Sequence, residues 1–285
     1  MTKKHLTYYI PEIRSVVWLI MLVIMVVLIL LPIFFIIKFS ISDRSSIVTG
    51  GAVMPLWPYK ITFDTYKHFI FENKNFLNVM LNSLRLAIYT IFISMVLGVP
   101  AAYILARCHF PGKLFFIVCL ISVRFFPDIC SVVPVVKIFI KLNLYGTFIG
   151  AALTHSLLAL PYVIFISQGV FEAIPMDLED QAQVLGASRI GAFMRIILPI
   201  AFPGLAAAAI YTFLLSWDEF IFVYFLLGFS QIETLTIFLK SKLSDGMRQE
   251  NFLAAISMLL SFPVIIFTFV IQKYMKSGMT AGAVK

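Results

Sequence analysis

Long stretches without a charged residue constrain this sequence more than any other feature. Residues 16–37, 86–106 and 252–271 are apolar and free of charge. Each run is about 20 residues long, the length that an α-helix needs to cross the ~30 Å hydrocarbon core of a bilayer. Only 13% of the chain is charged, about half of the share in soluble domains. The sequence therefore predicts that lipid is the main solvent of this protein.

Three further apolar runs carry isolated polar residues and cover residues 114–136, 148–170 and 200–228. With all six runs counted as spanning helices, the predicted fold is an all-α, polytopic membrane protein whose termini lie on the same side. The first run is long and is followed by no small-residue cleavage site. We therefore expect a retained span there and not a signal peptide.

Charge gives only a mild indication of orientation. Lys3, Lys4 and Arg14 flank the first run and favour a cytoplasmic N-terminus, although the loops on the two sides carry similar numbers of Lys and Arg. The net charge of +8 suits loops that face anionic lipid. The basic residues form no patch or stripe, so nucleic acid is not an expected partner.

Residues 172–199 break the apolar pattern. Acidic residues follow Pro175, as is typical of a first helical turn, because the helix dipole favours negative charge there. Leu178, Ala182 and Leu185 have the i, i+4, i+7 spacing of one apolar stripe on a helix. The segment thus predicts an amphipathic helix between two membrane spans.

A second short helix is expected after this one. Gly186 can adopt the left-handed geometry that ends a helix, and Ser188 can cap the next helix. Pro199 marks the next expected break. The segment is interpreted as a helix-turn-helix with an apolar face that can bind a partner. The alternative is an amphipathic hairpin that lies on the membrane surface.

The spacing of residues 180–199 carries a resemblance. Asp180-Gln181-Ala182, three residues, Gly186, nine residues and then the sequence 196–199 (Ile-Ile-Leu-Pro) resemble the E-A-A-x3-G-x9-I-x-L-P signature of permease subunits of binding-protein-dependent ABC importers. Pro203-Gly204-Leu205, the sequence 216–220 and the tail 278–285 are similar to elements of the carbohydrate branch of that family. The resemblance covers roughly residues 75–285. Asp180 replaces the usual Glu, Gln181 replaces an Ala, and Leu185 stands where the sugar branch usually has Asp.

The resemblance implies a type I ABC importer permease fold with six transmembrane helices and a cytoplasmic helix-turn-helix that couples to an ATPase. It implies a sugar importer in the bacterial inner membrane, with both termini cytoplasmic. The implied partners are a second permease subunit, two ATPase subunits that hold the ATP and Mg²⁺, and an external solute-binding protein. The implied ATPase-coupling residues are Leu178, Glu179, Asp180, Ala182, Leu185, Gly186, Ala187, Ser188, Ile196, Leu198 and Pro199.

The expected organisation has four parts. A cytoplasmic lead occupies residues 1–15, and the first helix with a long external loop occupies residues 16–75. A core of five spanning helices covers residues 76–273 and contains the coupling loop 172–199. A cytoplasmic tail covers residues 274–285.

No enzymatic chemistry is recognisable in the sequence. Gly112-Lys113 is followed by Leu114, so the phosphate-binding Gly-Lys-Ser/Thr pattern fails, and no Cys or His spacing suggests a metal site. We therefore expect a non-catalytic subunit without a bound cofactor or metal. The main rival, an ion-coupled secondary transporter, would need inverted repeats or broken helices around an ion site, and no convincing repeat is present. A membrane-embedded enzyme would need a cluster of titratable residues.

Polar residues inside the apolar runs are candidates for the solute pathway, because they are costly in lipid. Arg124 and Asp128 are four residues apart and are expected to pair on one helix face, either as a structural ion pair or on the pathway. His155 is expected to be a hydrogen-bonded packing residue. The run 200–228 is interrupted at Trp217-Asp218-Glu219. Two carboxylates and an indole ring suit the hydroxyls and ring faces of a sugar or, alternatively, serve helix packing and gating. The complete candidate set is Arg124, Asp128, His155, Trp217, Asp218 and Glu219.

Overall fold

The computed structural model describes residues 6–43, 57, 60–244 and 250–281. It is 83% helical, and its described residues form no strand beyond an isolated bridge between Ser42 and Ile61. The predicted all-α class is thereby confirmed. The chain divides into two compact units, one of residues 1–72 with 242–261 and the other of residues 73–241 with 262–285. Residues 1–5 of the expected lead and 282–285 of the expected tail lie outside the described part.

The first unit contains the long helix α1 (Leu6–Ser40), the short helix α3 (Asp64–Lys67), the π-helical turn η1 (His68–Glu72) and the beginning of α13 (Glu250–Ala281). None of the most apolar window of α1 is buried. A helix that is hydrophobic all round and uncovered requires lipid or another subunit around it. Phe69 of η1 packs edge-on against Phe252 of α13, with ring centroids 5.4 Å apart.

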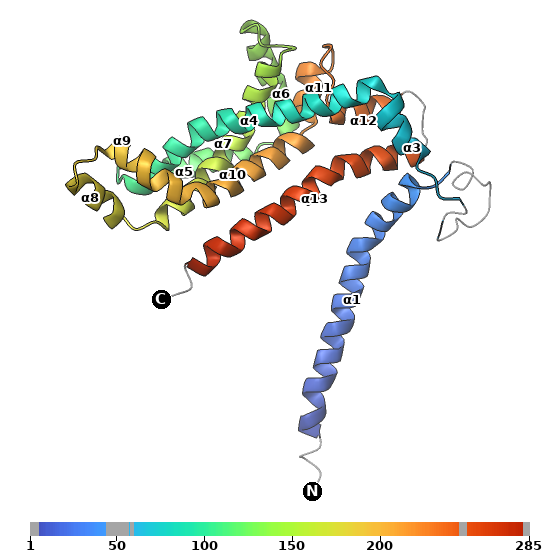
Figure 1. Cartoon of the computed structure of the whole chain (residues 1–285), viewed down its shortest axis with the longest axis horizontal. Coiled ribbons are helices and arrows are strands. Elements are labelled where there is room, and N and C mark those ends of the chain that lie inside the picture. The colour runs from blue at the N-terminus through green and yellow to red at the C-terminus, as the bar shows by residue number, and fades with distance from the viewer. Residues whose placement is uncertain (1–5, 44–56, 58–59, 245–249, 282–285) are drawn as a thin grey trace. The chain divides into compact units, whose positions relative to one another are not determined.

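The second unit is built around α7, which packs against both α4 and α10. Figure 1 shows α8 and α9 at one end of this unit and α11 at the opposite end. Its helices are α4 (Lys74–Arg107), α5 (Lys113–Ser122), the 3-10 turn η2 (Val123–Phe125), α6 (Asp128–Lys141), α7 (Phe148–Glu172), α8 (Asp177–Val184), α9 (Arg189–Ala192), the π-helical turn η3 (Phe193–Ile197), α10 (Leu198–Asp218), α11 (Ile221–Leu227) and α12 (Leu235–Ser244).

Two glycines allow α4 and α10 to approach α7 closely. A Cβ atom on Gly98 would lie 2.6 Å from Cγ1 of Val163, and a Cβ atom on Gly204 would lie 2.7 Å from both γ-carbons of Val170. No real Cβ contact is that short, so each position requires glycine while the valine stays in place. Small residues of this kind are typical of helix contacts in membranes, where close backbone approach supplies the packing energy.

In the part of the chain that the structure describes, five helices are long and apolar enough to span a membrane: Ser15–Ser40, Asn75–Arg107, Phe148–Glu172, Arg189–Asp218 and Glu250–Val270. The segments Lys113–Phe125 and Asp128–Lys141 make a sixth when they count as one span, and they meet at a bend of 100°. The predicted six-span arrangement is confirmed in this sense. The third span differs from a straight helix because Pro127 stands at the break with an extended ψ of 132°, and proline disfavours helical geometry in the residue before it.

Two details of the fifth span differ from, or refine, the sequence expectation. The expected break at Pro199 is wrong, because helical structure continues from Arg189 to Asp218. The π-helical turn Phe193–Ile197 precedes the proline, and Pro199 lies in the first turn of α10, where a missing N–H donor is tolerated. The break instead falls at Glu219, which is extended with ψ 128°, so the run 200–228 forms two helices.

Candidate functional site

The loop between α7 and α10 forms the predicted helix-turn-helix. Gly186 has a φ of +91°, the left-handed region that glycine occupies without strain. The N–H of Gly186 donates to the carbonyl of Gln183 at 2.9 Å, and the N–H of Ala187 donates to the carbonyl of Ala182 at 3.0 Å. This pair of bonds is the Schellman arrangement that satisfies the last carbonyls of a helix. Gly186 therefore ends α8 as the sequence predicts.

The start of α9 is also as predicted. Oγ of Ser188 accepts a hydrogen bond from the N–H of Gly191 at 3.1 Å, which satisfies one of the free donors at the helix start. The two caps fix the direction in which the chain leaves α8 and enters α9. The geometry of the turn is thus set by local hydrogen bonds.

Glu179 fastens this loop to the end of α4. Nε of Arg107 donates to Oε1 of Glu179 at 2.6 Å, and the hydroxyl of Tyr103 donates to Oε2 at 2.6 Å. Arg107 also donates from Nη2 to the carbonyl of Ile174 at 2.9 Å. The side chains of Arg107 and Glu179 are only 8% and 9% exposed. A charged pair so well shielded and hydrogen-bonded holds α8 firmly against α4.

The predicted apolar stripe of α8 does not lie on one face. Ala182 is 4% exposed and Leu178 packs against the core of the second unit, whereas Leu185 is 88% exposed. The cause is the length of α8, which ends at Val184 and leaves Leu185 in the turn. Leu178 and Ala182 thus attach the loop to its own subunit and do not face outward.

The tip of the loop presents a small apolar surface. Val184, Leu185 and Ile190 are 88%, 88% and 77% exposed. Among the other expected coupling residues, Asp180, Gly186, Ser188 and Pro199 are exposed and Ala187, Ile196 and Leu198 are half-buried. Exposed aliphatic side chains on a short, rigid turn are suited to a complementary partner surface.

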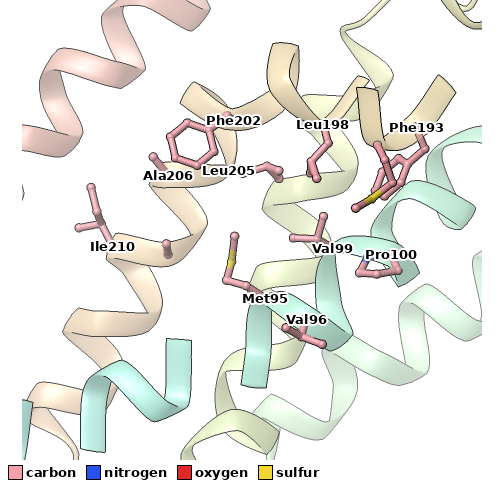
Figure 2. A pocket seen from close by; sticks show the side chains of 12 residues that line it. Met95, Val96, Val99, Pro100, Phe193, Leu198, Phe202, Leu205, Ala206 and Ile210 are labelled. Carbon is pink, nitrogen blue, oxygen red and sulfur yellow. The ribbon is translucent and has the colours of Figure 1, made fainter. Parts of the chain in front are cut away.

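Two hollows adjoin the loop. One has a volume of about 510 Å³ and lies between the end of α4 and the helices α8 and α9, with Arg107, Asp180 and Arg189 on its walls. The other has a volume of about 580 Å³ and lies between α4 and α10. Figure 2 shows the second hollow, whose lining side chains include Met95, Val99, Phe202 and Ile210 and carry almost no polar atoms.

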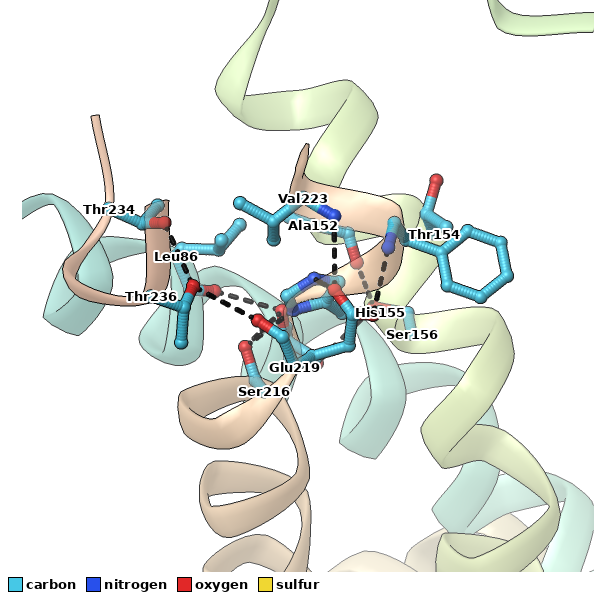
Figure 3. Close-up of polar contacts among 12 residues, drawn as sticks. Leu86, Ala152, Thr154, His155, Ser156, Ser216, Glu219, Val223, Thr234 and Thr236 are labelled. Carbon is cyan, nitrogen blue, oxygen red and sulfur yellow. Dashed lines mark hydrogen bonds and ion pairs between the residues drawn. The ribbon is translucent and has the colours of Figure 1, made fainter. Parts of the chain in front are cut away.

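A buried polar network surrounds His155, which is fully buried. Its Nδ1 lies 2.8 Å from Oγ of Ser216 and its Nε2 lies 3.2 Å from Oε2 of Glu219. Oγ of Ser216 donates to Oγ1 of Thr90 at 3.3 Å, and Oγ1 of Thr236 donates to the carbonyl of Glu219 at 3.2 Å. Figure 3 shows these contacts, which join α4, α7, α10 and α12 around the break after α10.

Glu219 also caps α11. Its Oε1 accepts from the N–H of Phe222 at 2.8 Å and its Oε2 accepts from the N–H of Val223 at 3.0 Å. Both oxygens are therefore engaged within the chain. The expectation that His155 is a hydrogen-bonded packing residue agrees with this geometry, and the capping role of Glu219 favours packing and gating over direct solute contact.

The other residues proposed for the solute pathway differ in how far they are buried. Trp217 is 3% exposed and stacks on Phe213 with ring centroids 5.4 Å apart, so its ring face is already covered. Asp218 is exposed. Nη1 of Arg124 lies 3.2 Å from Oδ1 of Asp128, so the two side chains pair as expected. They do not share one helix face, because the 100° bend lies between them.

Sequence reasoning missed Tyr103 and Arg107. Both lie in the second apolar run or directly after it, with i, i+4 spacing, and their partner Glu179 follows 72 or more positions later. A charged residue at the end of a spanning helix has an ordinary explanation in lipid contact. The pairing therefore leaves no local signal in the sequence.

Comparison with known proteins agrees with the fold. Residues 76–281 match the family described as binding-protein-dependent transport system inner membrane component. The trehalose transport system permease protein SugB of Mycobacterium tuberculosis is 31% identical over 274 residues, which cover 95% of this chain and 98% of that protein. The diacetylchitobiose uptake system permease protein DasC of Streptomyces coelicolor is 28% identical over 276 residues, 96% of each chain.

A solved structure shows the same fold. It is the crystal structure of a bacterial ABC transporter involved in the import of the acidic polysaccharide alginate, in which one chain matches with a TM-score of 0.77 and 24% identity. The match covers 92% of this chain and 96% of that chain. The chain thus has the fold of an ABC importer permease, and it belongs to the family of binding-protein-dependent transport system inner membrane components.

Membership in this family settles the broad class of function. The chain is a multi-pass inner-membrane permease subunit of an ABC importer, and members of this family are non-catalytic subunits that work with an ATPase and a binding protein. None of the matches described here supports the ion-coupled secondary transporter. The described residues hold no group of three or more His, Cys, Asp or Glu side chains arranged for a metal ion.

Proposed function

We propose that this chain forms half of the translocation pathway of an ATP-driven importer for di- or oligosaccharides. Its partners are a second, different permease subunit, two ATPase subunits and an external solute-binding protein. Carbohydrate specificity is supported by the names of relatives, which transport trehalose, diacetylchitobiose and, in Bacillus subtilis, arabinooligosaccharides. The tail 278–285 and the sequence 216–220 support it through their resemblance to the carbohydrate branch.

The loop 172–199 transmits the motion of the ATPases in this proposal. The observation that carries it is a loop with an uncovered apolar tip and a fixed root. Leu185 at the tip is 88% exposed, whereas Glu179 at the root is bound to Arg107 in shielded surroundings. A push on the tip therefore reaches α4 without being absorbed by a flexible loop.

The nucleotide chemistry is assigned to the partners. ATP and Mg²⁺ bind to the ATPase subunits, and this chain binds no cofactor. Both termini and the loop 172–199 are placed in the cytoplasm, where the ATPases are. The flank that carries Lys3, Lys4 and Arg14 supports this orientation through the excess of positive charge that is typical of cytoplasmic segments.

Reconstitution tests the proposal. The complex is assembled from this chain, its neighbouring permease, ATPase and binding protein, and is placed in proteoliposomes. Uptake of radiolabelled trehalose, diacetylchitobiose and arabinotriose is then measured with and without ATP. We expect ATP-dependent uptake of at least one saccharide that requires the binding protein. Uptake of none of them, or uptake driven by an ion gradient without ATP, would contradict the proposal.

A further inference from the structure

We propose that Arg124, Asp128, Tyr162 and Tyr211 form a solute-contact surface that recognises the hydroxyl groups and the apolar ring face of a saccharide during its passage. This inference rests on the proposed function, and it names the residues of this chain that touch the solute. Neither tyrosine stands out in the sequence, where the two are far apart. The structure brings them together beside the charged pair.

Four side chains from separate elements converge here. Tyr162 of α7 and Tyr211 of α10 have ring centroids 4.8 Å apart with an interplanar angle of 50°. The guanidinium carbon of Arg124, in η2, lies 5.7 Å from the centroid of the Tyr162 ring. Arg124 in turn contacts Asp128 at the start of α6. The result is a continuous patch with two aromatic rings at one end and a charged pair at the other.

The charged end of this patch has hydrogen-bonding capacity to spare. Nε of Arg124 is buried and has no hydrogen-bond partner among the residues that the structure describes. A guanidinium has five N–H donors, and a buried donor without an acceptor costs free energy. The side chain of Asp128 is 35% exposed and its Oδ1 is the atom that Arg124 contacts, while a carboxylate can accept several hydrogen bonds. Nε itself is shielded, so an approaching group meets the exposed part of the two side chains, 19% of Arg124 and 35% of Asp128. A group that both accepts and donates hydrogen bonds fits this pair.

The backbone at this place also points to a pathway. The chain bends by 100° between Phe125 and Asp128, and Phe126 is extended with ψ 131°. Non-helical backbone within a spanning segment is tolerated where it is buried in protein or lines a water-filled cavity. The residue Phe126 is 67% exposed, so the bend lies at a surface that this chain leaves uncovered. A solute pathway along this surface supplies the water or the polar solute that non-helical backbone needs.

The chemistry of the patch matches a saccharide better than an ion. A sugar hydroxyl donates and accepts, so it can bridge the Arg124 donors and the Asp128 acceptors. The carbon-bound hydrogens on one face of a pyranose form an apolar surface that packs against aromatic rings. An inorganic anion would use Arg124 but would be repelled by Asp128, and it would leave the tyrosine rings without a role.

A structural ion pair between Arg124 and Asp128 is the rival explanation, and double substitution separates the two. If the pair is only structural, removing one partner leaves an uncompensated charge, and removing both relieves the damage. If the pair binds solute, the double variant remains defective because the hydroxyl contacts are gone. Arg124→Lys adds a third comparison, because it keeps the charge next to Asp128 but loses the planar set of donors.

The test uses the reconstituted complex and the saccharide of the panel that the wild-type complex transports. The maximal uptake rate is divided by the rate of ATP hydrolysis in the same vesicles, at saturating loaded binding protein. We expect Arg124→Lys, Tyr211→Ala and the double variant Arg124→Gln/Asp128→Asn each to lower the saccharide moved per ATP by about tenfold. Tyr211→Phe should retain most of it, because the ring face remains. Tyr89→Ala is the matched control, since Tyr89 is 49% exposed on α4 and lies outside the patch.

Several outcomes overturn the inference. One such outcome is that Arg124→Gln or Asp128→Asn alone is defective but the double variant takes up saccharide normally. The pair would then be a structural ion pair. If Arg124→Lys and Tyr211→Ala move as much saccharide per ATP as the wild type, these residues do not contact the solute and the inference is wrong. The proposed function is unaffected by that result, because the wild-type complex still takes up the saccharide. A wild-type complex that moves none of the three saccharides defeats the proposed function itself and the inference with it.

Discussion

Nε of Arg107 lies 2.6 Å from Oε1 of Glu179, although the two residues are 72 positions apart in the chain. The contact joins the last residue of α4 to the first turn of α8. Since both side chains are shielded from solvent, neither can be removed without leaving the other charge uncompensated. The loop 172–199 is therefore held to the end of a spanning helix by a shielded ion pair.

Glu179→Gln should weaken that connection while it keeps the shape of the side chain. The neutral amide still accepts one hydrogen bond but leaves the charge of Arg107 without a counter-ion. We expect ATP hydrolysis to continue and the saccharide moved per ATP in proteoliposomes to fall by roughly tenfold, which corresponds to ~1.4 kcal/mol. Glu72→Gln is the control, because Glu72 is an exposed carboxylate in the first unit. Equal coupling in both variants would show that the pair does not transmit motion.

A negative charge at the loop tip (Leu185) and one at its root (Leu178) should affect different properties of the protein. Leu185→Asp places a carboxylate on the exposed tip, so we expect normal thermal stability of the solubilised chain but reduced co-purification of the ATPase. Leu178→Asp buries a charge against the core, so we expect lower thermal stability. The comparison of melting temperature with ATPase recovery measures both effects. If Leu178→Asp loses ATPase binding but keeps its full thermal stability, the ATPase docks on the face of α8 that carries Leu178 and Ala182, and not on the loop tip.

Glu219 is expected to act through structure. Glu219→Ala removes the acceptor for two N–H groups of α11, and loss of a helix cap costs about 1 kcal/mol. It also leaves His155 without one of its two partners. We expect lower thermal stability and poorer assembly with the second permease, with a smaller effect for Glu219→Gln. Asp218→Asn should leave stability unchanged. Normal assembly of Glu219→Ala with reduced uptake would instead assign Glu219 to solute contact.

The glycine contacts of α7 make a packing prediction. Gly98→Ala places a Cβ atom 2.6 Å from Val163, and overpacking of this kind costs about 1–3 kcal/mol. We expect a lower melting temperature, which the additional substitution Val163→Ala restores. Gly169→Ala is the control, since a Cβ atom there meets nothing within 4 Å. An unchanged melting temperature in Gly98→Ala would show that α4 and α7 are farther apart than the structure has them. A lowered temperature that Val163→Ala does not restore would show that Val163 is not the side chain that clashes.

Local signals account for what the sequence predicted correctly. The length of each apolar run sets the spans, and Gly186 and Ser188 cap their helices through bonds to neighbours only a few residues away. The pairing of Arg107 with Glu179 and the meeting of Tyr162 with Tyr211 depend on how distant helices pack, so the sequence alone does not reveal them. The prediction of a helix break at Pro199 is wrong, because the π-helical turn before it accommodates a residue that usually ends a helix.

The central claim is that the loop 172–199 couples the ATPases to the spanning helices, and Gly186 tests it most directly. Gly186 has a φ of +91°, and a Cβ atom there would meet nothing within 4 Å. Gly186→Val therefore meets no clash at Cβ within this chain, strains the backbone at a cost of about 1–2 kcal/mol in the left-handed region, and re-aims the tip.

The measurement is the stimulation of ATP hydrolysis by saccharide-loaded binding protein in proteoliposomes that contain the assembled complex. For the wild-type complex we predict clear stimulation together with uptake. For Gly186→Val we predict hydrolysis near the unstimulated rate and loss of uptake, with partial recovery in Gly186→Asn, because asparagine tolerates this conformation. Full stimulation and full uptake in Gly186→Val would contradict the assignment of residues 172–199 as the coupling loop.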